Sequence, residues 1–480
     1  MAASRNVWRS SGAVKYLALD LGTSFIKGAV LDLERLVITD VIRRPFPAAL
    51  PGLPPLWVEV DPQAVVVATR SLLDELAAYA PDAVGVVVCS QMHGLVLMDA
   101  AGRLRSNVVT WQDQRILQPN PRGAGSYFDV IMARLPQVQQ QALGNGLKPS
   151  LPLCTLAWWA ARGELPSGVI PASLGDYVLA ALGSQAPVVE PSMAASMGAL
   201  DLPTGRWHAV ALGNLGLGGL AWPQIVDATT PAYAIPVGDR HLPCCPPVGD
   251  HQAAVLGALL QPGELSLNIS TGSQVSVLAP RFRTGEYEVR PYFDGSFLQT
   301  ITRIPAGRAL NALVDLLLEL SHAEGFAVQN PWATIAAAVE ATPETDLQVD
   351  LAFFASPVGD RGAITNIREE TLRVGHLFRA AFRAMAANYR LCAGRLDPSQ
   401  PWSRLVFSGG LAQRFAPLRA EIGRAFGVAE RLCPAAEDTL LGLLALALAA
   451  SGRASGVAEA TAQLRATYAV EDAAPGAPAA

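Results

Sequence analysis

The sequence predicts an α/β fold divided into two domains. Short runs rich in β-branched residues alternate with helical segments along the chain, which is typical of this fold class. The chain has 480 residues, more than one ordinary hydrophobic core accommodates. A proline-rich connection, "HLPCCPPVGD", lies near the midpoint. We place the boundary between Pro246 and Pro247, which gives an N-terminal domain over 14–246 and a C-terminal domain over 247–455.

Individual elements follow from the hydrophobic pattern. Residues 83–91, "AVGVVVCSQ", have the length and β-branched content of a buried strand. Residues 93–115 predict a strand, a turn at Asp-Ala-Ala-Gly and a second strand. Residues 62–80 and 376–396 are predicted helices.

Composition and charge exclude several classes of protein. Apolar residues make up 51% of the chain, which supports large cores, and the net charge of -5 argues against broad nucleic-acid binding. The apolar segment 439–452 is shorter than the roughly 20 residues that a membrane span needs. The N-terminus does not have the uninterrupted apolar region of a signal peptide. The tail 471–480, "EDAAPGAPAA", has the composition of a disordered segment.

The cysteines point to the compartment. There are six, none with CxxC spacing. Buried, reduced thiols in a cytoplasmic protein therefore explain them better than a disulfide framework or a zinc site.

One stretch near the N-terminus has a counterpart later in the chain. Residues 16–32, "YLALDLGTSFIKGAVLD", and 265–280, "LSLNISTGSQVSVLAP", each predict a strand, a short turn rich in Gly, Ser and Thr, and a second strand. Asp20 and Asn268 stand in comparable places. Polar hairpin turns occur in any β-rich protein, and shape alone favours that explanation. One such hairpin at the start of each predicted domain favours an internal repeat.

The first turn has the chemistry of an anion site. Gly22, Thr23 and Ser24 offer exposed backbone N–H groups and two hydroxyls, which together suit phosphate. Asp20 would repel phosphate unless a divalent cation lay between them, and Mg²⁺ is usually held by one or two carboxylates plus substrate phosphates. Two such hairpins facing each other would hold a triphosphate from both sides. No G-x-x-x-x-G-K-[ST] sequence is present, so the chain is not a P-loop protein.

Two stretches carry side chains suited to a sugar. Met92 and His93 directly follow a predicted strand, and ligand sites in α/β folds favour strand ends, although a lone histidine is more often structural. The stretch "VTWQDQR" places Trp111, Asp113 and Arg115 within five residues. Flat rings and carboxylates bind sugars in this way. A structural ion pair between Asp113 and Arg115 is an equally good interpretation.

Two more stretches concern the reaction. Asp250 in "VGDHQAAVLGA" precedes an Ala-rich helix, where an aspartate is a good N-cap, but it could also act as a general base toward an attacking hydroxyl. Gly409 and Gly410 end a predicted strand in "RLVFSGGLAQ", where the backbone either approaches a ligand closely or turns into a helix.

Taken together, seven stretches in this order resemble the FGGY carbohydrate kinases, within the actin, hexokinase and Hsp70 superfamily. They are "LALDLGTSFIKG", "SQMHGLVLMDAAGR", "TWQDQR", "VGDHQAAVLGA", "LNISTGSQ", "VFSGGLAQ" and "EDTLLGLLALA". The resemblance extends from about Val14 to about Ala450. It implies two ribonuclease-H-like domains flanking a cleft in which ATP, Mg²⁺ and a sugar meet.

The resemblance also implies roles for the candidate residues. Asp250 is then the catalytic base, and Asp20 helps to hold the metal. The implied sugar-binding residues are Met92, His93, Gln112, Asp113 and His251. The implied ATP-binding residues are Gly22, Thr23, Ser24, Thr271, Gly272, Gly409 and Gly410. The expected partners are a sugar and ATP. Whether the chain forms a homodimer is left open by the sequence.

Within the family, four stretches are most similar to the sedoheptulokinases: "VTWQDQR", "LSLNISTGSQVSVLAP", "VRPYFDGSFLQT" and "GHLFRAAFRAMAANY". This implies ATP-dependent phosphorylation of the terminal primary hydroxyl of a ketose, with sedoheptulose as the expected sugar. A xylulose or ribulose kinase is the alternative within the enzyme class. A nucleotide-binding regulatory protein on the same fold is the alternative outside it.

Three departures from the family pattern concern the choice of sugar. His251 follows the expected base where many pentulose kinases have asparagine. The loop Phe354–Ile367 replaces an acidic loop, and Glu190–Ser196 replaces an Asp-x-Ser-Asn-Ala-Ser segment. All three are expected in or near sugar-facing regions.

Overall fold

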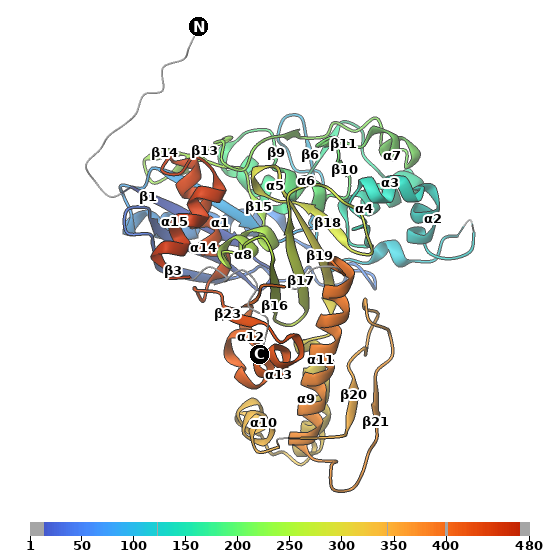
Figure 1. Cartoon of the computed structure of the whole chain (residues 1–480). Helices are drawn as coiled ribbons and strands as arrows, with labels where there is room; N and C mark the ends of the chain where they lie inside the picture. The colour runs from blue at the N-terminus through green and yellow to red at the C-terminus, as the bar shows by residue number, and fades with distance from the viewer. Residues whose placement is uncertain (1–13, 122, 343, 399–401, 471–480) are drawn as a thin grey trace.

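The computed structural model describes residues 14–121, 123–342, 344–398 and 402–470. Among them the strands form two large mixed sheets, one in each of two lobes, with helices packed on the sheets (Figure 1). The predicted α/β class is confirmed. The predicted disordered tail, 471–480, lies outside the described residues.

The sheet of the first lobe carries the first hairpin. Its order is β13–β14–β5–β1–β2–β3, with β15 paired to β5. The strands β1, β2 and β3 form an antiparallel meander, whereas β5 runs parallel to β1 and β14 runs parallel to β5. The bounds are β1 Lys15–Leu21, β2 Phe25–Asp32, β3 Val37–Pro45, β5 Gly85–Ser90, β13 Tyr233–Val237, β14 Arg240–Cys244 and β15 Val248–Gly249.

The sheet of the second lobe repeats this scheme. Its order is β18–β19–β17–β16–β22–β23. The strands β16, β17 and β19 form an antiparallel meander, and β22 and β23 continue in parallel on the other side of β16. The bounds are β16 Glu264–Ile269, β17 Ser273–Ala279, β18 Glu288–Pro291, β19 Phe297–Ile304, β22 Arg404–Ser408 and β23 Ala429–Leu432.

The two predicted hairpins therefore occupy equivalent places. The hairpin β1–β2 and the hairpin β16–β17 each form the antiparallel centre of a sheet, beside the first parallel strand. In the first, Asp20 pairs with Lys27, and in the second, Asn268 pairs with Gln274. The internal repeat expected from two short stretches is a repeat of whole sheets.

Helices enclose both sheets. α1 and α5 cover one face of the first sheet, and α8, α14 and α15 cover the other. α9, α10, α11 and α13 cover one face of the second sheet, while the end of α8 packs on its other face. The bounds are α1 Pro62–Tyr79, α5 Leu174–Gly183, α8 Asp250–Gly257, α9 Gly307–Ala323, α10 Pro331–Glu340, α11 Val374–Leu396, α12 Gly410–Arg414, α13 Ala416–Phe426, α14 Asp438–Ala450 and α15 Val457–Thr467.

An additional helical region extends the first lobe on the right of Figure 1, around a core with Trp158 at its centre. Its helices are α2 Tyr127–Arg134, α3 Gln137–Ala142, α4 Pro152–Arg162 and α7 Ala209–Asn214, with the short 3₁₀ turn Arg115–Leu117. The helix α6 Pro191–Ser196 packs in a separate cluster that includes Met92. Small paired strands complete the structure: β4 Glu59–Val60, β6 Val96–Asp99, β7 Val108–Val109, β8 Val169–Ala172, β9 Val188–Val189, β10 Leu200–Asp201, β11 Arg206–Trp207, β12 Gln224–Ile225, β20 Gln348–Asp350 and β21 Ala363–Thr365. The other 3₁₀ turn is Phe293–Gly295.

The helices α8 and α14 cross at a very short distance, which two glycines allow. A Cβ atom on Gly257 would lie 1.8 Å from the carbonyl oxygen of Asp438. A Cβ atom on Gly442 would lie 2.0 Å from the carbonyl oxygen of Ala253. Because α8 lies between the two sheets, this contact joins the C-terminal helices to both lobes.

The predicted boundary falls at a point where the two lobes are interwoven. β15, which begins just after Pro247, still pairs with β5 of the first sheet. The chain also returns to the first sheet at its end, because α14 and α15 pack in the same cluster as Tyr16 and Cys89. The division into 14–246 and 247–455 stays a prediction, and the first lobe combines residues from both ends of the chain.

Two expectations from composition can be compared with the structure. All six cysteines are buried and free of disulfides, as expected. Within the described residues, no helix combines the length and the apolar character that crossing a membrane would take.

We predict that Gly442→Ala destabilises the protein by about 3 kcal/mol or more, because the added methyl group meets a backbone oxygen that cannot move aside. The matched control is Gly394→Ala in α11, where an added Cβ meets open space. That change should stabilise by about 0.5–1 kcal/mol, since alanine loses less backbone entropy in a helix. Urea unfolding of both variants measures the difference. Equal effects of the two would show that the close crossing of α8 and α14 does not limit stability.

Candidate active site

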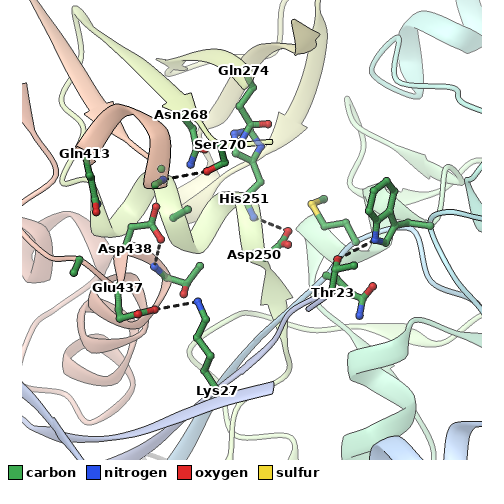
Figure 2. A pocket seen from close by; sticks show the side chains of 18 of the residues that line it. Thr23, Lys27, Asp250, His251, Asn268, Ser270, Gln274, Gln413, Glu437 and Asp438 are labelled. Carbon is green, nitrogen blue, oxygen red and sulfur yellow. Dashed lines mark hydrogen bonds and ion pairs between the residues drawn. The ribbon is translucent and has the colours of Figure 1, made fainter. Parts of the chain in front are cut away.

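A cleft between the lobes gathers most of the predicted residues. Two adjoining cavities, of about 570 and about 690 Å³, make up the cleft. Both are lined by Thr23 and Lys27 of the first hairpin, Ser270 of the second hairpin, and Gly410. Figure 2 shows the two hairpins approaching the start of α8 from different sides.

Asp250 is the first residue of α8 and lines the cavity of about 570 Å³. The N-cap position belongs to Gly249, so the N-cap interpretation of Asp250 is wrong. The Asp250 Oδ1 atom accepts a hydrogen bond from the backbone N–H of His251 at 2.8 Å. Burial, reinforced by the neighbouring charge of Asp20, raises the pKa of Asp250 to about 7. A carboxyl group with this pKa can take a proton near neutral pH.

A short chain of hydrogen bonds holds the backbone before Asp250. The Gly249 N–H donates to Ser192 Oγ at 2.9 Å, and the Ser192 hydroxyl donates to the buried carboxyl group of Glu190. Both residues belong to the segment Glu190–Ser196, which departs from the family pattern. Its place next to Gly249 and Asp250 agrees with the expectation that the segment lies near the site.

Asp20 lies at the centre of a charged group on the other side of the cleft. It accepts a hydrogen bond from Thr439 Oγ1 at 2.8 Å, and Lys27 Nζ lies 3.3 Å from its carboxylate. Lys27 also donates to Glu437 at 3.0 Å (Figure 2). Burial alone would lower the pKa of Lys27, but Asp20 and Glu437 overcome that effect and raise it to about 12. Lys27 is therefore a fixed positive charge in the cleft.

The carboxyl groups of Asp20, Asp250 and Asp438 face this region, which suits a cation. Burial first, and the charge of Asp20 as well, raise the pKa values of Asp250 to about 7 and of Asp438 to about 6. A divalent cation would relieve this repulsion. Among the described residues, no three His, Cys, Asp or Glu side chains are spaced to hold a metal by themselves. The arrangement thus fits Mg²⁺ that takes most of its ligands from phosphates and water.

The first turn is fixed from two directions. Trp111 Nε1 donates to Thr23 Oγ1 at 2.9 Å, and Gln91 Nε2 donates to the carbonyl oxygen of Gly22 at 3.3 Å. The sugar-side stretches and the predicted phosphate turn are therefore in direct contact. Ser24 and Gly22 line the adjoining cavity.

The second turn lies against the glycines that end β22. Ser270 Oγ accepts from the Gly410 N–H at 3.2 Å, and Gly409 has a φ of 84°, a conformation that favours glycine. Thr271 lines the cavity beside these residues. Gly272 belongs to the same turn, where its carbonyl oxygen accepts from the Ser270 N–H, but it lines neither of the two cavities.

Met92, His93 and His251 line the same cavity as Asp250. His93 has a φ of 69°, which is a strained conformation for this residue type, at the end of the buried strand β5. Burial lowers the pKa of His93 to about 3, so its ring is neutral. His251 is buried as well, and both of its ring nitrogens have protein partners.

Two predicted sugar residues lie elsewhere. Asp113 is buried, accepts from the Val58 N–H at 2.7 Å and forms an ion pair with Arg115 at 2.8 Å. Its oxygens are thus occupied, and neither Asp113 nor Gln112 lines the cleft. The alternative interpretation, a structural ion pair, is the correct one for Asp113, and Trp111 is the residue of that stretch that reaches the cleft.

The variant loop Phe354–Ile367 also lies away from the cleft. It ends in β21, which pairs with β20 in the second lobe (Figure 1). None of its residues lines either cavity. The expectation that this loop lies near the sugar is not supported by its position.

Several cleft residues were not among the candidates. They are Lys27, Asn268, Ser270, Gln274, Arg290, Gln413, Glu437, Asp438 and Thr439. A signal was present for some: Lys27 interrupts an apolar strand, and Glu437 and Asp438 stand directly before the apolar helix α14. Arg290 lies in the stretch "VRPYFDGSFLQT", which resembles the sedoheptulokinases, but one charged residue on a short strand gave no chemical reason to single it out.

Solved structures with this arrangement define a class of two-lobed sugar kinase folds. A gluconate kinase from Lactobacillus acidophilus superimposes with a TM-score of 0.81 over 96% of this chain and 97% of that chain, at 17% identity. A Plasmodium falciparum glycerol kinase solved with ADP superimposes with a TM-score of 0.80 over 94% of this chain and 92% of that chain, at 16% identity. At these identities the comparison concerns the fold.

The sequence comparison gives the family. The model of the N-terminal domain of the FGGY family of carbohydrate kinases matches residues 15–257. The chain belongs to this family. Mouse sedoheptulokinase is 25% identical over 462 residues, covering 85% of this chain and 92% of the mouse protein. Xylulose kinase from Escherichia coli strain K12 is 30% identical over 152 residues, covering 30% of this chain and 28% of that protein.

We predict that kcat/KM falls as the pH drops through about 7, because the active form of Asp250 is the carboxylate and its pKa is about 7. Asp250→Asn should remove this pH dependence and lower kcat by about 10²-fold or more. Asp176→Asn is the matched control, because burial raises the pKa of Asp176 to about 7 as well, in α5 outside the cleft. That variant should keep the parent's pH profile. Near-normal turnover of Asp250→Asn would show that Asp250 is not the base.

Proposed function

We propose that this protein catalyses ATP-dependent phosphorylation of the terminal primary hydroxyl of a ketose, with sedoheptulose as the preferred sugar. The observation that carries the proposal is the position of Asp250, at the start of a helix between the two phosphate-type turns and beside Met92 and His93. The similarity to mouse and human sedoheptulokinases over most of the chain supports the choice of sugar.

The proposed roles follow from the geometry of the cleft. The sugar lies against Met92, His93 and Trp111, with the hydroxyl to be phosphorylated next to Asp250. The turns at Thr23 and at Thr271 hold the phosphates of ATP from two sides, and Gly409–Gly410 contact the adenosine part. Transfer of a phosphoryl group needs mainly alignment and neutralisation of charge.

Lys27 and a Mg²⁺ ion supply that neutralisation in this proposal. Lys27 is held in the cleft by Asp20 and Glu437. Asp20 would hold a Mg²⁺ ion from the protein side, and that ion would offset the negative charge of the phosphates. Asp250 takes the proton of the attacking hydroxyl. Closing of the lobes excludes water, which would otherwise compete as the acceptor.

The alternatives differ in measurable ways. A xylulose or ribulose kinase would prefer a five-carbon sugar. A nucleotide-binding regulatory protein on the same fold would release no ADP in response to a sugar.

We predict a higher kcat/KM for sedoheptulose than for D-xylulose or D-ribulose. Hydrogen-bonding groups that meet the longer chain stay unpaired with a shorter one, at a cost of about 1–3 kcal/mol each. The measurement is sugar-dependent ADP release with the three ketoses at saturating ATP. A preference for D-xylulose would overturn the choice of sugar and leave a ketose kinase. ADP release with none of them would overturn the proposed function.

We predict that Asp20→Ala strongly lowers Mg²⁺-dependent turnover and raises the Mg²⁺ concentration needed for half-maximal rate, because the cation and Lys27 both lose their carboxylate. Sugar binding without nucleotide, measured by calorimetry, should be retained, since the sugar residues lie on the other side of Asp250. Asp32→Ala, at the far end of the same hairpin, is the control. Full activity of Asp20→Ala at low Mg²⁺ would contradict the role of Asp20.

A further inference from the structure

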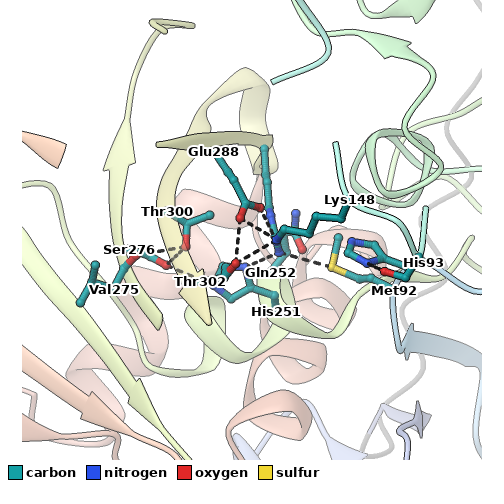
Figure 3. Close-up of polar contacts among 12 residues, drawn as sticks. Met92, His93, Lys148, His251, Gln252, Val275, Ser276, Glu288, Thr300 and Thr302 are labelled. Atoms are coloured by element: carbon teal, nitrogen blue, oxygen red, sulfur yellow. Dashed lines mark hydrogen bonds and ion pairs between the residues drawn. The ribbon is translucent and has the colours of Figure 1, made fainter. Parts of the chain in front are cut away.

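A network of charged residues closes the sugar end of the cleft and links the two lobes (Figure 3). Lys148, which precedes α4 in the first lobe, donates to Glu288 Oε1 at 2.6 Å and to Thr302 Oγ1 at 2.9 Å. Arg290 donates from Nη2 to Glu288 Oε2 at 2.8 Å. Glu288 and Arg290 lie on β18, and Thr302 on β19. Each oxygen of one buried carboxylate therefore holds one cation.

Arg290 is also held from a second side, by His251. Arg290 Nη1 donates to His251 Nδ1 at 3.0 Å, which requires the His251 proton on Nε2. Nε2 lies 3.2 Å from Ser276 Oγ, and Ser276 Oγ lies 2.8 Å from Thr300 Oγ1. Burial, and then Arg290, lower the pKa of His251 well below its usual range, so the ring stays a neutral acceptor.

Both ring nitrogens of His251 thus have protein partners, so neither is free to form a hydrogen bond with the sugar. The residue that replaces the asparagine of many pentulose kinases instead orients a guanidinium group. Arg290 lines the cleft together with Met92 and Asp250. Glu288 and His251 fix its plane, which is the geometry that a guanidinium needs for directional hydrogen bonding.

Arg290 keeps donors for a ligand. A guanidinium has five N–H groups. Contacts with protein in the described chain involve Nη1 and Nη2, namely the bonds to His251 and Glu288 and a 3.8 Å contact of Nη1 with Met92 Sδ. Nε has no partner among the described residues. At least one donor is therefore left for an oxygen atom of a molecule in the cleft.

The balance of charges at this end selects the kind of molecule. Lys148 and Arg290 are positive, and Glu288 and the carboxylate form of Asp250 are negative, while His93 and His251 are neutral. The exposed Arg303 also acts on Lys148, but water screens its charge. The two positive and two negative charges therefore cancel when Asp250 is ionised, which is the form that can accept a proton. A neutral sugar preserves this balance, whereas a sugar acid adds an unpaired negative charge beside Glu288 and Asp250.

We propose that Arg290 is the specificity-determining residue of the sugar site, donating hydrogen bonds to oxygen atoms of a neutral ketose beyond the hydroxyl that is phosphorylated, and that His251, Glu288 and Lys148 are positioning residues for it. This inference rests on the proposed function and adds the residue that selects the sugar. Because Lys148 comes from the first lobe and Arg290 from the second, the site is complete only when the lobes are in contact at this end.

The test compares Arg290→Lys, which keeps the charge but loses the planar group of donors, with the parent. The control is Arg379→Lys, the same change in a buried ion pair with Glu421 outside the cleft. The assay is sugar-dependent ADP release with sedoheptulose, D-xylulose, D-ribulose and D-gluconate. We expect Arg290→Lys to lower kcat/KM for the best ketose by about 10- to 10²-fold, the effect of losing one hydrogen bond to a charged donor.

The pattern of the loss separates a specificity role from a structural one. The ratio of kcat/KM between sedoheptulose and the five-carbon ketoses should approach one in Arg290→Lys, while the KM for ATP and the melting temperature stay near those of the parent. Arg379→Lys should leave the ratio unchanged. Lys148→Met should shift the ratio in the same direction, and Lys148→Arg should restore it, because a cation again holds Glu288.

Each result decides between outcomes. The inference is overturned if Arg290→Lys leaves the ratio of kcat/KM between the ketoses unchanged. It is also overturned if this variant loses activity equally on all sugars and has a higher KM for ATP. In both cases the parent's activity on ketoses leaves the proposed function standing. A parent that uses D-gluconate and no ketose overturns the proposed function and the charge-balance argument together. Use of a ketose and rejection of D-gluconate by the parent, with a lost preference in Arg290→Lys, supports both.

Discussion

The crossing of α8 and α14 is the contact on which the site depends. It brings backbone atoms so close that neither Gly257 nor Gly442 can carry a side chain. Asp250 stands at the beginning of α8, and Asp438 and Thr439 stand at the beginning of α14. A side chain at the crossing would move these two helix starts apart. The two glycines therefore help to set the distance between the proposed base and the carboxylates around Asp20, together with the hydrogen bond from Thr439 to Asp20.

The cleft concentrates buried charge, and its two ends handle that charge differently. At the phosphate end, Asp20 and Glu437 share Lys27, and the excess of carboxylates favours a cation from outside the chain. At the sugar end, the excess is removed internally, since Glu288 is matched by Lys148 and Arg290. Asp250 lies between the two ends, and charges from both ends act on it: Asp20 raises its pKa and Arg290 lowers it. This difference fits a site in which one ligand is highly charged and the other neutral.

Duplication of one sheet explains how two turns from distant parts of the chain come to face each other. Each sheet places its hairpin turn at the same edge, and the lobes face each other across α8. The additional contacts differ between the copies: Trp111 fixes the first turn through Thr23, whereas Gly410 fixes the second through Ser270. The repeat supplies the general placement, and residues outside it supply the details.

The sequence by itself determined the class of fold, the two hairpins, the long helices α1 and α11, and the position of Asp250 at the start of a helix. These features depend on local pattern: alternation, helical period, and glycines and hydroxyls next to one another. Residues whose role depends on distant partners were decided only by the tertiary structure. Asp113 was equally compatible with a sugar and with an ion pair until Val58 and Arg115 were seen to occupy it. The stretch that contains Arg290 resembled the sedoheptulokinases, but the role of this residue was not visible there. Its orientation comes from His251 on α8 and from Glu288, whose carboxylate is shared with Lys148, 140 residues away from Glu288. Burial and electrostatic coupling join groups that are far apart in the chain, and no local pattern records them.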